Sequence, residues 1–423
     1  MPTPGLHPLR FLLGIVLSGL LILGGLGFGG SKGVLPASLA AAAGNYFGKP
    51  DAPGGSASGA TAGEAGPVPV PKAGAAEHGS ATAMVLDISG SMESPAQIPS
   101  GFPQAAELKE KQDAFGSLVE QAKSGKKVTA GILIAGISGI ADLVRLSSKL
   151  NDYLKAQGID PATISKLSAL KVSTKSMLRT LAAERQGLGL DHRVGLVTFS
   201  DTANVLAPLS SDMAGLAAQV DTLKTEGSTN MGDGLQNGLT LVQDQPGAGI
   251  VLLTDGWNNT GMTDDQILSG PVATAVARGI PICAIGIGES SFDVDQAFLT
   301  QVASRSGGAY YFVGDRASLA GAMLACHNTI SGQKVAEFNG RVTQGQTVSG
   351  PQFTIAGGKH RLSLSLTWPG SDLDLQIKDA GGQVIGSGGH GTLSHQPGLI
   401  VATLPNPPAG AYTVQVNGRQ VSG

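Results

Sequence analysis

Apolar runs that alternate with helical patterns constrain the fold of this chain more than any other feature. Strands that alternate with helices form crossover units and a mainly parallel sheet. Ala203–Leu206 follows its preceding run too closely for a crossover helix, so it predicts an antiparallel edge strand. Residues 80–331 therefore predict an α/β fold with a doubly wound, mainly parallel sheet. The apolar runs are Ala81–Leu86, Arg193–Phe199, Ile250–Thr254, Ile282–Gly286 and Tyr310–Val313, and the helical patterns are Ile164–Arg185, Met213–Leu223, Met231–Gln243, Asp264–Arg278, Asp295–Ser306 and Arg316–Ile330.

Oxygen-bearing side chains follow two of these strands and precede one helix. The segment Asp87-Ile88-Ser89-Gly90-Ser91 closes the first apolar run, Thr229 precedes a helical pattern, and Asp255 ends a later strand. Because the carboxyl ends of parallel strands share one edge, we expect these residues to meet there. Hard divalent cations take oxygen ligands. A strand that ends in Asp, or a Ser-Gly-Ser turn, is by itself more often turn chemistry than a ligand.

Taken together, these residues resemble the metal-ion-dependent adhesion site of a von Willebrand factor A (VWA) domain. The segment Arg193–Phe199 followed by Ser200-Asp201-Thr202 also resembles the second strand and turn of that family. The likeness covers most of residues 80–331. The residues that match the family's metal site are Asp87, Ser89 and Ser91 in D-x-S-x-S, the later Thr229, and Asp255 in the T-D-G turn.

The resemblance implies a role for each of these residues and a function for the domain. Ser89 and Ser91 would bind Mg²⁺ or Mn²⁺ directly, and Thr229 would do so in the ligand-engaged state. Asp87 and Asp255 would act largely through bound water. Such an ion keeps much of its positive charge, and an acidic residue of a partner protein would fill its open position. The family mechanism is adhesion, and it breaks no bond.

An insertion of about 95–162 interrupts the family pattern between the first strand and Ile164–Arg185. It holds two helical patterns, Ala105–Lys123 and Val128–Lys155, and the second has one apolar stripe at Leu133, Ile137, Ile140 and Val144. Its charge-free part is too short to span a bilayer. We expect a helical hairpin beside the metal site that restricts access to it. The alternative is contact with a membrane or a partner helix, which would make the protein an assembly or membrane-perturbing factor.

The first 79 residues predict a membrane segment and a linker. Phe11–Gly29 is uncharged and close to the length that crosses a bilayer, which favours an uncleaved signal anchor within residues 1–30. Cleavage near Ala37–Ala40 is the alternative. Residues 31–79 are expected to be a flexible linker rich in Ala, Gly and Pro. In either case the rest of the chain would be extracytoplasmic, anchored in the membrane or secreted.

The two cysteines, Cys283 and Cys326, lie in a predicted central strand and near the end of a predicted helix. We expect two separate buried side chains. Outside the cytoplasm a disulfide is the alternative, and the sequence does not show whether the geometry allows it.

Short alternating runs in residues 332–423 predict a small all-β sandwich. The expected strands are Gln352–Ile355, Arg361–Trp368, Leu373–Lys378, Val384–Ser387, Leu399–Leu404 and Tyr412–Val416. The segments Trp368–Leu375 and Ala409–Val414 resemble the bacterial pre-peptidase C-terminal type of domain, in which paired acidic residues bind Ca²⁺. Asp372 and Asp374 would be that pair here. The favoured alternative is that both are ordinary solvent-facing residues.

Charge and motif content narrow the possible functions. The net charge is −3, the pI is near 6.2 and no basic cluster is present, so nucleic acid is not expected as a partner. None of the seven histidines lies in an H-E-x-x-H motif, and no glycine-rich loop carries the lysine of a P-loop. We therefore expect a non-enzymatic, metal-dependent adhesion or protein-binding module at a bacterial cell envelope.

Overall fold

The computed structural model describes residues 79–420 apart from 100, 124–129, 289–292, 315, 332–340, 351, 360, 369–371 and 397–398. The predicted anchor at 11–29 and almost all of the predicted linker lie outside the described residues, and the proposed domain boundary at 332 falls in a gap between them. Among the helices that are described, none combines the length and apolar character needed to cross a bilayer.

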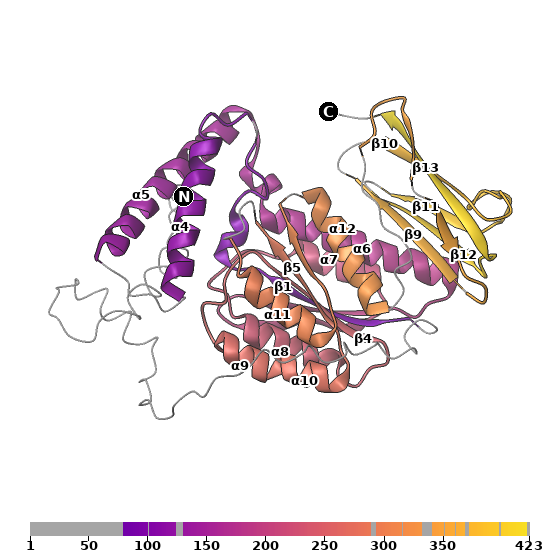
Figure 1. Cartoon of the computed structure of the whole chain (residues 1–423), viewed down its shortest axis with the longest axis horizontal. Coiled ribbons are helices and arrows are strands. Elements are labelled where there is room, and N and C mark those ends of the chain that lie inside the picture. The colour runs from indigo at the N-terminus through magenta and orange to yellow at the C-terminus, as the bar shows by residue number, and fades with distance from the viewer. Residues whose placement is uncertain are drawn as a thin grey trace, which may run out of the picture.

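A six-stranded sheet forms the centre of the larger part of the chain, with strand order β3-β2-β1-β4-β5-β6 (Figure 1). Only the β2–β3 pair is antiparallel, and the other four pairs are parallel. The predicted sheet, including its antiparallel edge strand, is confirmed. The strands are β1 (Ala81–Asp87), β2 (Arg193–Phe199), β3 (Ala203–Ser210), β4 (Ala248–Thr254), β5 (Ile282–Ile287) and β6 (Tyr310–Val313).

Helices cover both faces of this sheet, as expected for a doubly wound fold. Alternate residues of a strand point to opposite faces. Met84 and Leu86 of β1 accordingly belong to one apolar core, and Ala83 and Val85 to another. The first core includes residues of α6 (Lys166–Leu188), α7 (Met213–Asp221) and α12 (Arg316–Ser331), and the second includes residues of α8 (Met231–Val242), α9 (Asp264–Ser269), α10 (Pro271–Arg278) and α11 (Gln296–Ser306).

The single helix expected at Asp264–Arg278 is wrong, because two helices occupy that segment. Gly270 separates them and has non-helical backbone angles. Pro271 begins the second helix, where its missing amide proton costs nothing because the first amides of a helix have no partner within it.

The insertion forms the expected helical hairpin. After the short 3₁₀ helix η1 (Gly90–Glu93), α4 (Ala105–Lys123) and α5 (Ala130–Ala156) pack against each other, and η2 (Pro161–Ile164) leads into α6. Exposed ion pairs cross between the helices, with Arg145 Nη2 2.6 Å from Glu107 Oε1. The hairpin has a small core of its own, formed by Phe102, Leu108, Phe115, Leu143, Leu146, Leu150 and Leu154. Figure 1 shows the hairpin and the C-terminal sheets on different sides of the central sheet.

Two antiparallel sheets form the C-terminal part. One contains β10-β13-β7 with β8 also paired to β13, and the other contains β11-β12-β9. They share an apolar core that includes Tyr412 and Ile400. The strands are β7 (Thr347–Ser349), β8 (Phe353–Ile355), β9 (Arg361–Thr367), β10 (Asp372–Lys378), β11 (Thr392–Gln396), β12 (Leu399–Pro405) and β13 (Gly410–Gln420).

The strand expected at Val384–Ser387 is replaced by a turn region with isolated bridges. The Asp379 carboxylate accepts hydrogen bonds from the amides of Gly381 and Gln383, both at 2.8 Å, and so stabilises that turn. β12 pairs with β9 and with β11, a strand that was not predicted because its sequence has a weak apolar pattern.

The C-terminal sheets pack closely on α6. Ala183 of α6 forms a small buried cluster with Leu399 and Val401 of β12. A methyl group at Gly187 would lie 2.0 Å from Thr403 Oγ1, so the helix and strand approach to a distance that only glycine allows.

A disulfide joins Cys283 of β5 to Cys326 of α12, with a Cα–Cα distance of 5.5 Å. The expectation of two separate side chains was wrong. The sequence gives the type of each element but not that α12 packs over β5 at the height of both sulfur atoms.

Candidate metal centre

Asp87 lies at the end of β1 and is fully buried. Its Oδ1 accepts a hydrogen bond from the amide of Ser89 at 2.8 Å, and its Oδ2 accepts one from Thr254 Oγ1 at 2.6 Å. Thr254 ends β4, the neighbour of β1 in the sheet. The register of these two strands therefore fixes the Asp87 carboxylate at the carboxyl edge of the sheet.

Two carboxylates approach each other at this edge. Burial first, and then the negative charge of Asp255, raises the pKa of Asp87 to about 7. Hydrogen bonds from Ser89 and Thr254 act in the opposite direction. A cation placed between such groups would relieve both causes of the shift.

Ser89, Ser91 and Asp255 form a continuous hydrogen-bonded chain between the first and last loops of the site. Ser89 Oγ lies 3.0 Å from Ser91 Oγ, and Ser91 Oγ donates to Asp255 Oδ1 at 2.7 Å. Ser89 and Asp255 are buried. Three of the predicted oxygen donors thus converge although they come from distant parts of the sequence.

Thr229 borders the same space. It immediately precedes the N-cap residue of α8, Asn230, and its amide donates to Asn259 Oδ1 at 2.8 Å. A methyl group at Gly256 would lie 3.5 Å from Thr229 Oγ1 and 3.8 Å from Ser91 Oγ. The two hydroxyl oxygens therefore lie near one point beside Gly256, at van der Waals distance from it.

A glycine in the left-handed conformation shapes the loop before Thr229. Gly227 has a φ of +63°, and its carbonyl accepts a hydrogen bond from the amide of Gly90 at 3.1 Å. A Cβ atom at Gly227 would lie 2.5 Å from Asp201 Oδ2. Asp201 in turn accepts a hydrogen bond from the amide of Ser228. The hydrogen bond between Gly90 and Gly227 joins the Asp87 loop to the Thr229 loop, and Asp201 attaches the turn after β2 to the latter.

Lys166 is part of the site and was not predicted. Its Nζ donates to Asp255 Oδ2 at 2.9 Å, and its side chain is buried. The residue begins α6, where the helix dipole disfavours a positive charge. The available sequence signal was a lysine at the start of a helix, where a positive charge is unfavourable. In the protein without a bound cation, Lys166 neutralises Asp255.

The donor set suits a hard divalent cation. It consists of two carboxylates and three hydroxyls, all oxygen, at the edge where ligands bind in open α/β sheets. Mg²⁺ and Mn²⁺ both prefer such donors.

The predicted Ca²⁺ pair in the C-terminal part has a different environment. Asp374 Oδ2 accepts from Arg419 Nη2 at 2.7 Å, so an arginine already supplies its counter-charge. The side chain of Asp372 lies outside the described residues. This ion pair favours the interpretation that Asp374 is an ordinary surface residue.

Comparison with known proteins gives matches to part of the chain. The family model of the von Willebrand factor type A domain matches residues 146–323. The match begins within α5, after Asp87, and includes Thr229 and Asp255. A curated relative, the uncharacterized protein YfbK of Escherichia coli, is 28% identical over 149 residues, which is 33% of this chain and 24% of that protein.

Solved structures give remote matches. A von Willebrand factor type A protein from Catenulispora acidiphila is 14% identical with a TM-score of 0.38, over 82% of this chain and 59% of that one. Proximal thread matrix protein 1 from the mussel byssus, in a form with a zinc-occupied MIDAS motif, is 17% identical with a TM-score of 0.34, over 61% of this chain and 46% of that one.

Proposed function

Because the chain contains a von Willebrand factor type A domain, we propose that it binds a partner protein through a divalent cation. Asp87, Ser89, Ser91, Thr229 and Asp255 would hold the ion. The observation that carries the proposal is the hydrogen-bonded chain from Ser89 through Ser91 to Asp255, with the Thr229 hydroxyl facing the same point. The proposed function is adhesion or scaffolding and not catalysis.

Each side chain has a distinct part in this function. When bound, Mg²⁺ or Mn²⁺ would supply the positive charge that attracts an acidic side chain of the partner. Asp87 is held by Ser89 and Thr254 and orients the loop that carries both serines. Lys166 occupies one oxygen of Asp255 and would compete with the cation for that carboxylate. Partner binding would therefore depend on the cation concentration.

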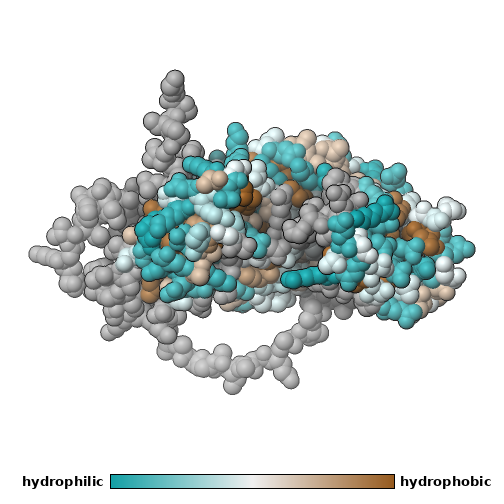
Figure 2. Space-filling view, turned by 90° about the horizontal axis from the view of Figure 1, so that it is seen from above, coloured by the Kyte–Doolittle hydropathy of each residue, from teal (hydrophilic) through white to brown (hydrophobic). Residues whose placement is uncertain are grey.

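The α4–α5 hairpin is proposed to select the partner. The segment that contains the hairpin begins after η1, within a few residues of Ser91, and ends where α6 begins at Lys166. The apolar side chains described for it are largely used in its own core. On the face seen in Figure 2, hydrophilic residues predominate and hydrophobic ones form small separate patches. The use of these side chains within the hairpin supports a partner-restricting role. The side chains of Leu133, Ile137 and Ile140, on which the alternative of a membrane-perturbing or assembly factor rests, lie outside the described residues.

We place this activity outside the cytoplasm, at a bacterial cell envelope, with residues 11–29 as the anchor or as a cleaved signal. Support for an oxidising compartment comes from the Cys283–Cys326 disulfide, since such bonds are rare in reducing ones. Ca²⁺ at Asp372 and Asp374 is not part of the proposal.

Cation-dependent partner capture tests the function. The wild-type protein and Asp87→Ala would be incubated with envelope extract in millimolar Mg²⁺ and again in EDTA, and Mg²⁺ uptake would be measured by calorimetry. We expect capture only by the wild type and only with Mg²⁺. Asp244→Ala is the matched control, because this exposed aspartate pairs with Arg278 just before β4, at the other end of that strand from Asp255. Equal capture in EDTA would exclude the proposed mechanism.

A further inference from the structure

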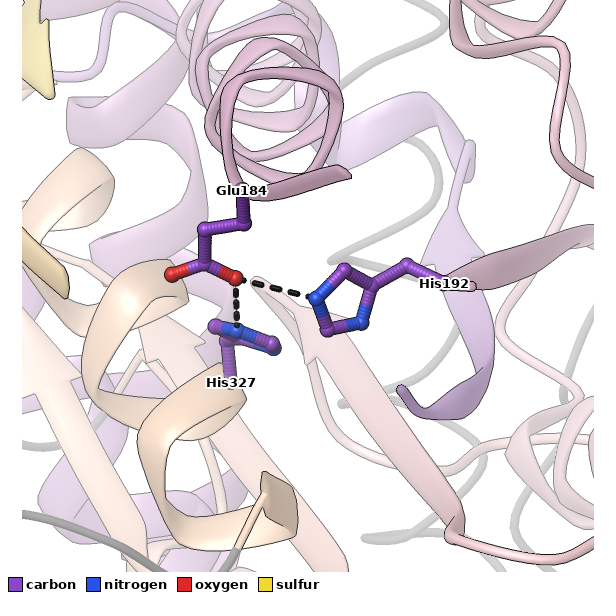
Figure 3. Close-up of side chains that lie close together, drawn as sticks. All are labelled: Glu184, His192 and His327. Carbon is purple, nitrogen blue, oxygen red and sulfur yellow. Dashed lines mark hydrogen bonds and ion pairs between the residues drawn. The ribbon is translucent and has the colours of Figure 1, made fainter. Parts of the chain in front are cut away.

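We propose that Glu184, His192 and His327 form a second metal site, selective for zinc-like transition metals. Figure 3 shows the three side chains turned toward one another. Glu184 comes from α6, His192 from the segment just before β2, and His327 from α12. The site is separate from the cation site at Asp87, and nothing in the proposed adhesion function requires it.

The distances suit a metal ion. His192 Nε2 lies 3.1 Å from Glu184 Oε2, and His327 Nε2 lies 3.0 Å from the same oxygen. All three ligand atoms lie within 4.8 Å of one another. Zn²⁺ binds imidazole nitrogen and carboxylate oxygen at about 2.0–2.2 Å, so tetrahedral ligand atoms stand roughly 3.3 Å apart. Small side-chain movements would convert the observed arrangement into a zinc site.

The site is enclosed and leaves ring nitrogens without hydrogen bonds. Glu184, His192 and His327 are 5%, 2% and 3% exposed. Among the described residues, His192 Nε2 and His327 Nδ1 are buried and have no hydrogen-bond partner. His192 Nε2 therefore faces the carboxylate oxygen without the alignment of a hydrogen bond. Buried polar atoms in native proteins nearly always have a partner, and a metal ion would supply one for His192 Nε2.

The buried carboxylate also needs a positive charge. Among the described residues, the side chains paired with the Glu184 carboxylate are the two imidazoles, which are cationic only when protonated. An uncompensated buried carboxylate is costly. Zn²⁺ would neutralise it without protonating either histidine.

Ser80 determines which nitrogen of His192 is free to bind. Without metal, the Ser80 amide donates to His192 Nδ1 at 3.1 Å, which places the single ring proton on Nε2. Ser80 Oγ lies 3.0 Å from the same Nδ1 and can accept a hydrogen bond when that nitrogen carries the ring proton. Metal binding would thus move the ring proton from Nε2 to Nδ1, with no net release, and the serine hydroxyl would take over from the amide. A polar group that accepts the second ring N–H is usual behind a metal-bound histidine.

The donor set distinguishes this site from the one at Asp87. Two imidazole nitrogens and one carboxylate favour Zn²⁺, whereas the all-oxygen set at Asp87 favours Mg²⁺ or Mn²⁺. A water molecule would complete four-coordination. A metal here would tie α6 to α12 and to the segment just before β2. The inferred role is structural.

Zinc loading of the full-length protein tests this inference. The protein would carry Asp87→Ala, so that zinc cannot occupy the adhesion site, and would be kept oxidised, so that Cys283 and Cys326 offer no thiolates. After EDTA treatment and dialysis against Zn²⁺ with excess Mg²⁺, elemental analysis should find about one zinc per chain. Co²⁺ in its place should give the visible absorption of a tetrahedral site.

Variants locate the ligands. Glu184→Gln and His327→Asn should lose the bound zinc and the Co²⁺ absorption, whereas His395→Asn, which changes an exposed histidine of β11, should keep both. Circular dichroism establishes that each variant is folded. The inference is overturned if the folded parent protein takes up no zinc or shows no tetrahedral Co²⁺ spectrum. Equal zinc loss in His395→Asn and His327→Asn would overturn it too.

Discussion

The contact between Lys166 and Asp255 determines how the adhesion site behaves at the scale of single residues. A buried ammonium and carboxylate neutralise each other, so removal of one partner leaves an uncompensated charge. Without Lys166, Asp255 would face Asp87 with only a metal ion to balance the two carboxylates.

We expect Lys166→Met to destabilise the protein in EDTA by about 3 kcal/mol, because it leaves Asp255 unpaired. The same change should strengthen Mg²⁺ binding on the order of tenfold or more, because the competing ammonium is gone. Urea denaturation in EDTA and calorimetric Mg²⁺ titration measure the two effects.

Lys175→Met is the control, since Lys175 lies on the same helix and pairs with the exposed carboxylate of Asp221. It should change neither quantity by more than about 0.5 kcal/mol. Unchanged or weaker Mg²⁺ binding by Lys166→Met would contradict a competitive role for Lys166.

The raised pKa of Asp87 predicts an unusual pH dependence of the stability of the cation-free protein. Its folded-state pKa of about 7 lies above its ordinary value of 3.8, so the folded state binds more protons than the unfolded state between these pH values. The contribution of Asp87 to stability is therefore full below about pH 4 and is lost as the pH rises through 7. Denaturation in EDTA at several pH values should show this loss, on the order of a few kcal/mol.

Asp87→Asn should flatten that pH dependence, because the amide does not titrate. Saturating Mg²⁺ should oppose the loss in the wild type. An identical pH profile for Asp87→Asn and wild type in EDTA would show that another group causes the dependence.

The convergence of the residues in the proposed adhesion site could largely be predicted from the sequence, and the reasons for the misses are physical. Asp87 and Asp255 directly follow apolar runs, and the rule for parallel sheets brings such positions together. Lys166 was missed because its ammonium reaches Asp255 only once the hairpin returns the chain beside the site. Glu184, His192 and His327 have no spacing motif, since their proximity depends on how α6 and α12 pack.

At the scale of elements, the disulfide ties α12 to β5. Cross-linking a loop of 43 residues restricts the unfolded chain and stabilises the fold by about 4 kcal/mol in the chain-entropy model. We expect the double variant Cys283→Ala, Cys326→Ala to lose most of that stability, measured by urea denaturation.

The wild type in reducing agent is the companion measurement, and it should approach the stability of the double variant. A stability that does not respond to reductant would mean that the bond is absent in solution.

The close approach of α6 and β12 predicts a second sensitive position. Gly187→Ala would place a methyl group 2.0 Å from Thr403 Oγ1 and 2.9 Å from Thr392 Oγ1. We expect a destabilisation of about 1–3 kcal/mol and faster proteolytic separation of the C-terminal sheets.

Gly321→Ala is the matched control, because Gly321 lies inside α12 and a methyl group there meets nothing within 4 Å. It should be neutral or stabilising by up to about 1 kcal/mol. If both variants were equally stable, α6 and β12 would not be in firm contact.

Secondary structure was predicted best where local patterns are strong. The helix at Ala105–Lys123 and the strands at Arg193–Phe199 and Tyr310–Val313 have the expected bounds. The strands of the C-terminal sheets were harder to predict, because β11 pairs with β12 through backbone hydrogen bonds that its weak apolar pattern does not reveal.

At the scale of the whole molecule, the α/β part carries two additions. The hairpin follows the first strand, and the sandwich packs on α6, the helix that also carries Glu184. One long helix thus begins at the adhesion site with Lys166 and ends under β12. Any displacement of α6 would therefore move both Lys166 and the residues that contact β12.

The central place of β1 has a consequence for the order of assembly. Among the strands of the described residues β1 is made first, yet it lies between β2 and β4, which emerge only after the hairpin and several helices. Pairing across such sequence separations is slow. The hairpin has its own core and can form before β1 pairs with β2 and β4. A divalent ion would then find its oxygens gathered only on a finished sheet, so cation capture would report completed folding and could not guide its early steps.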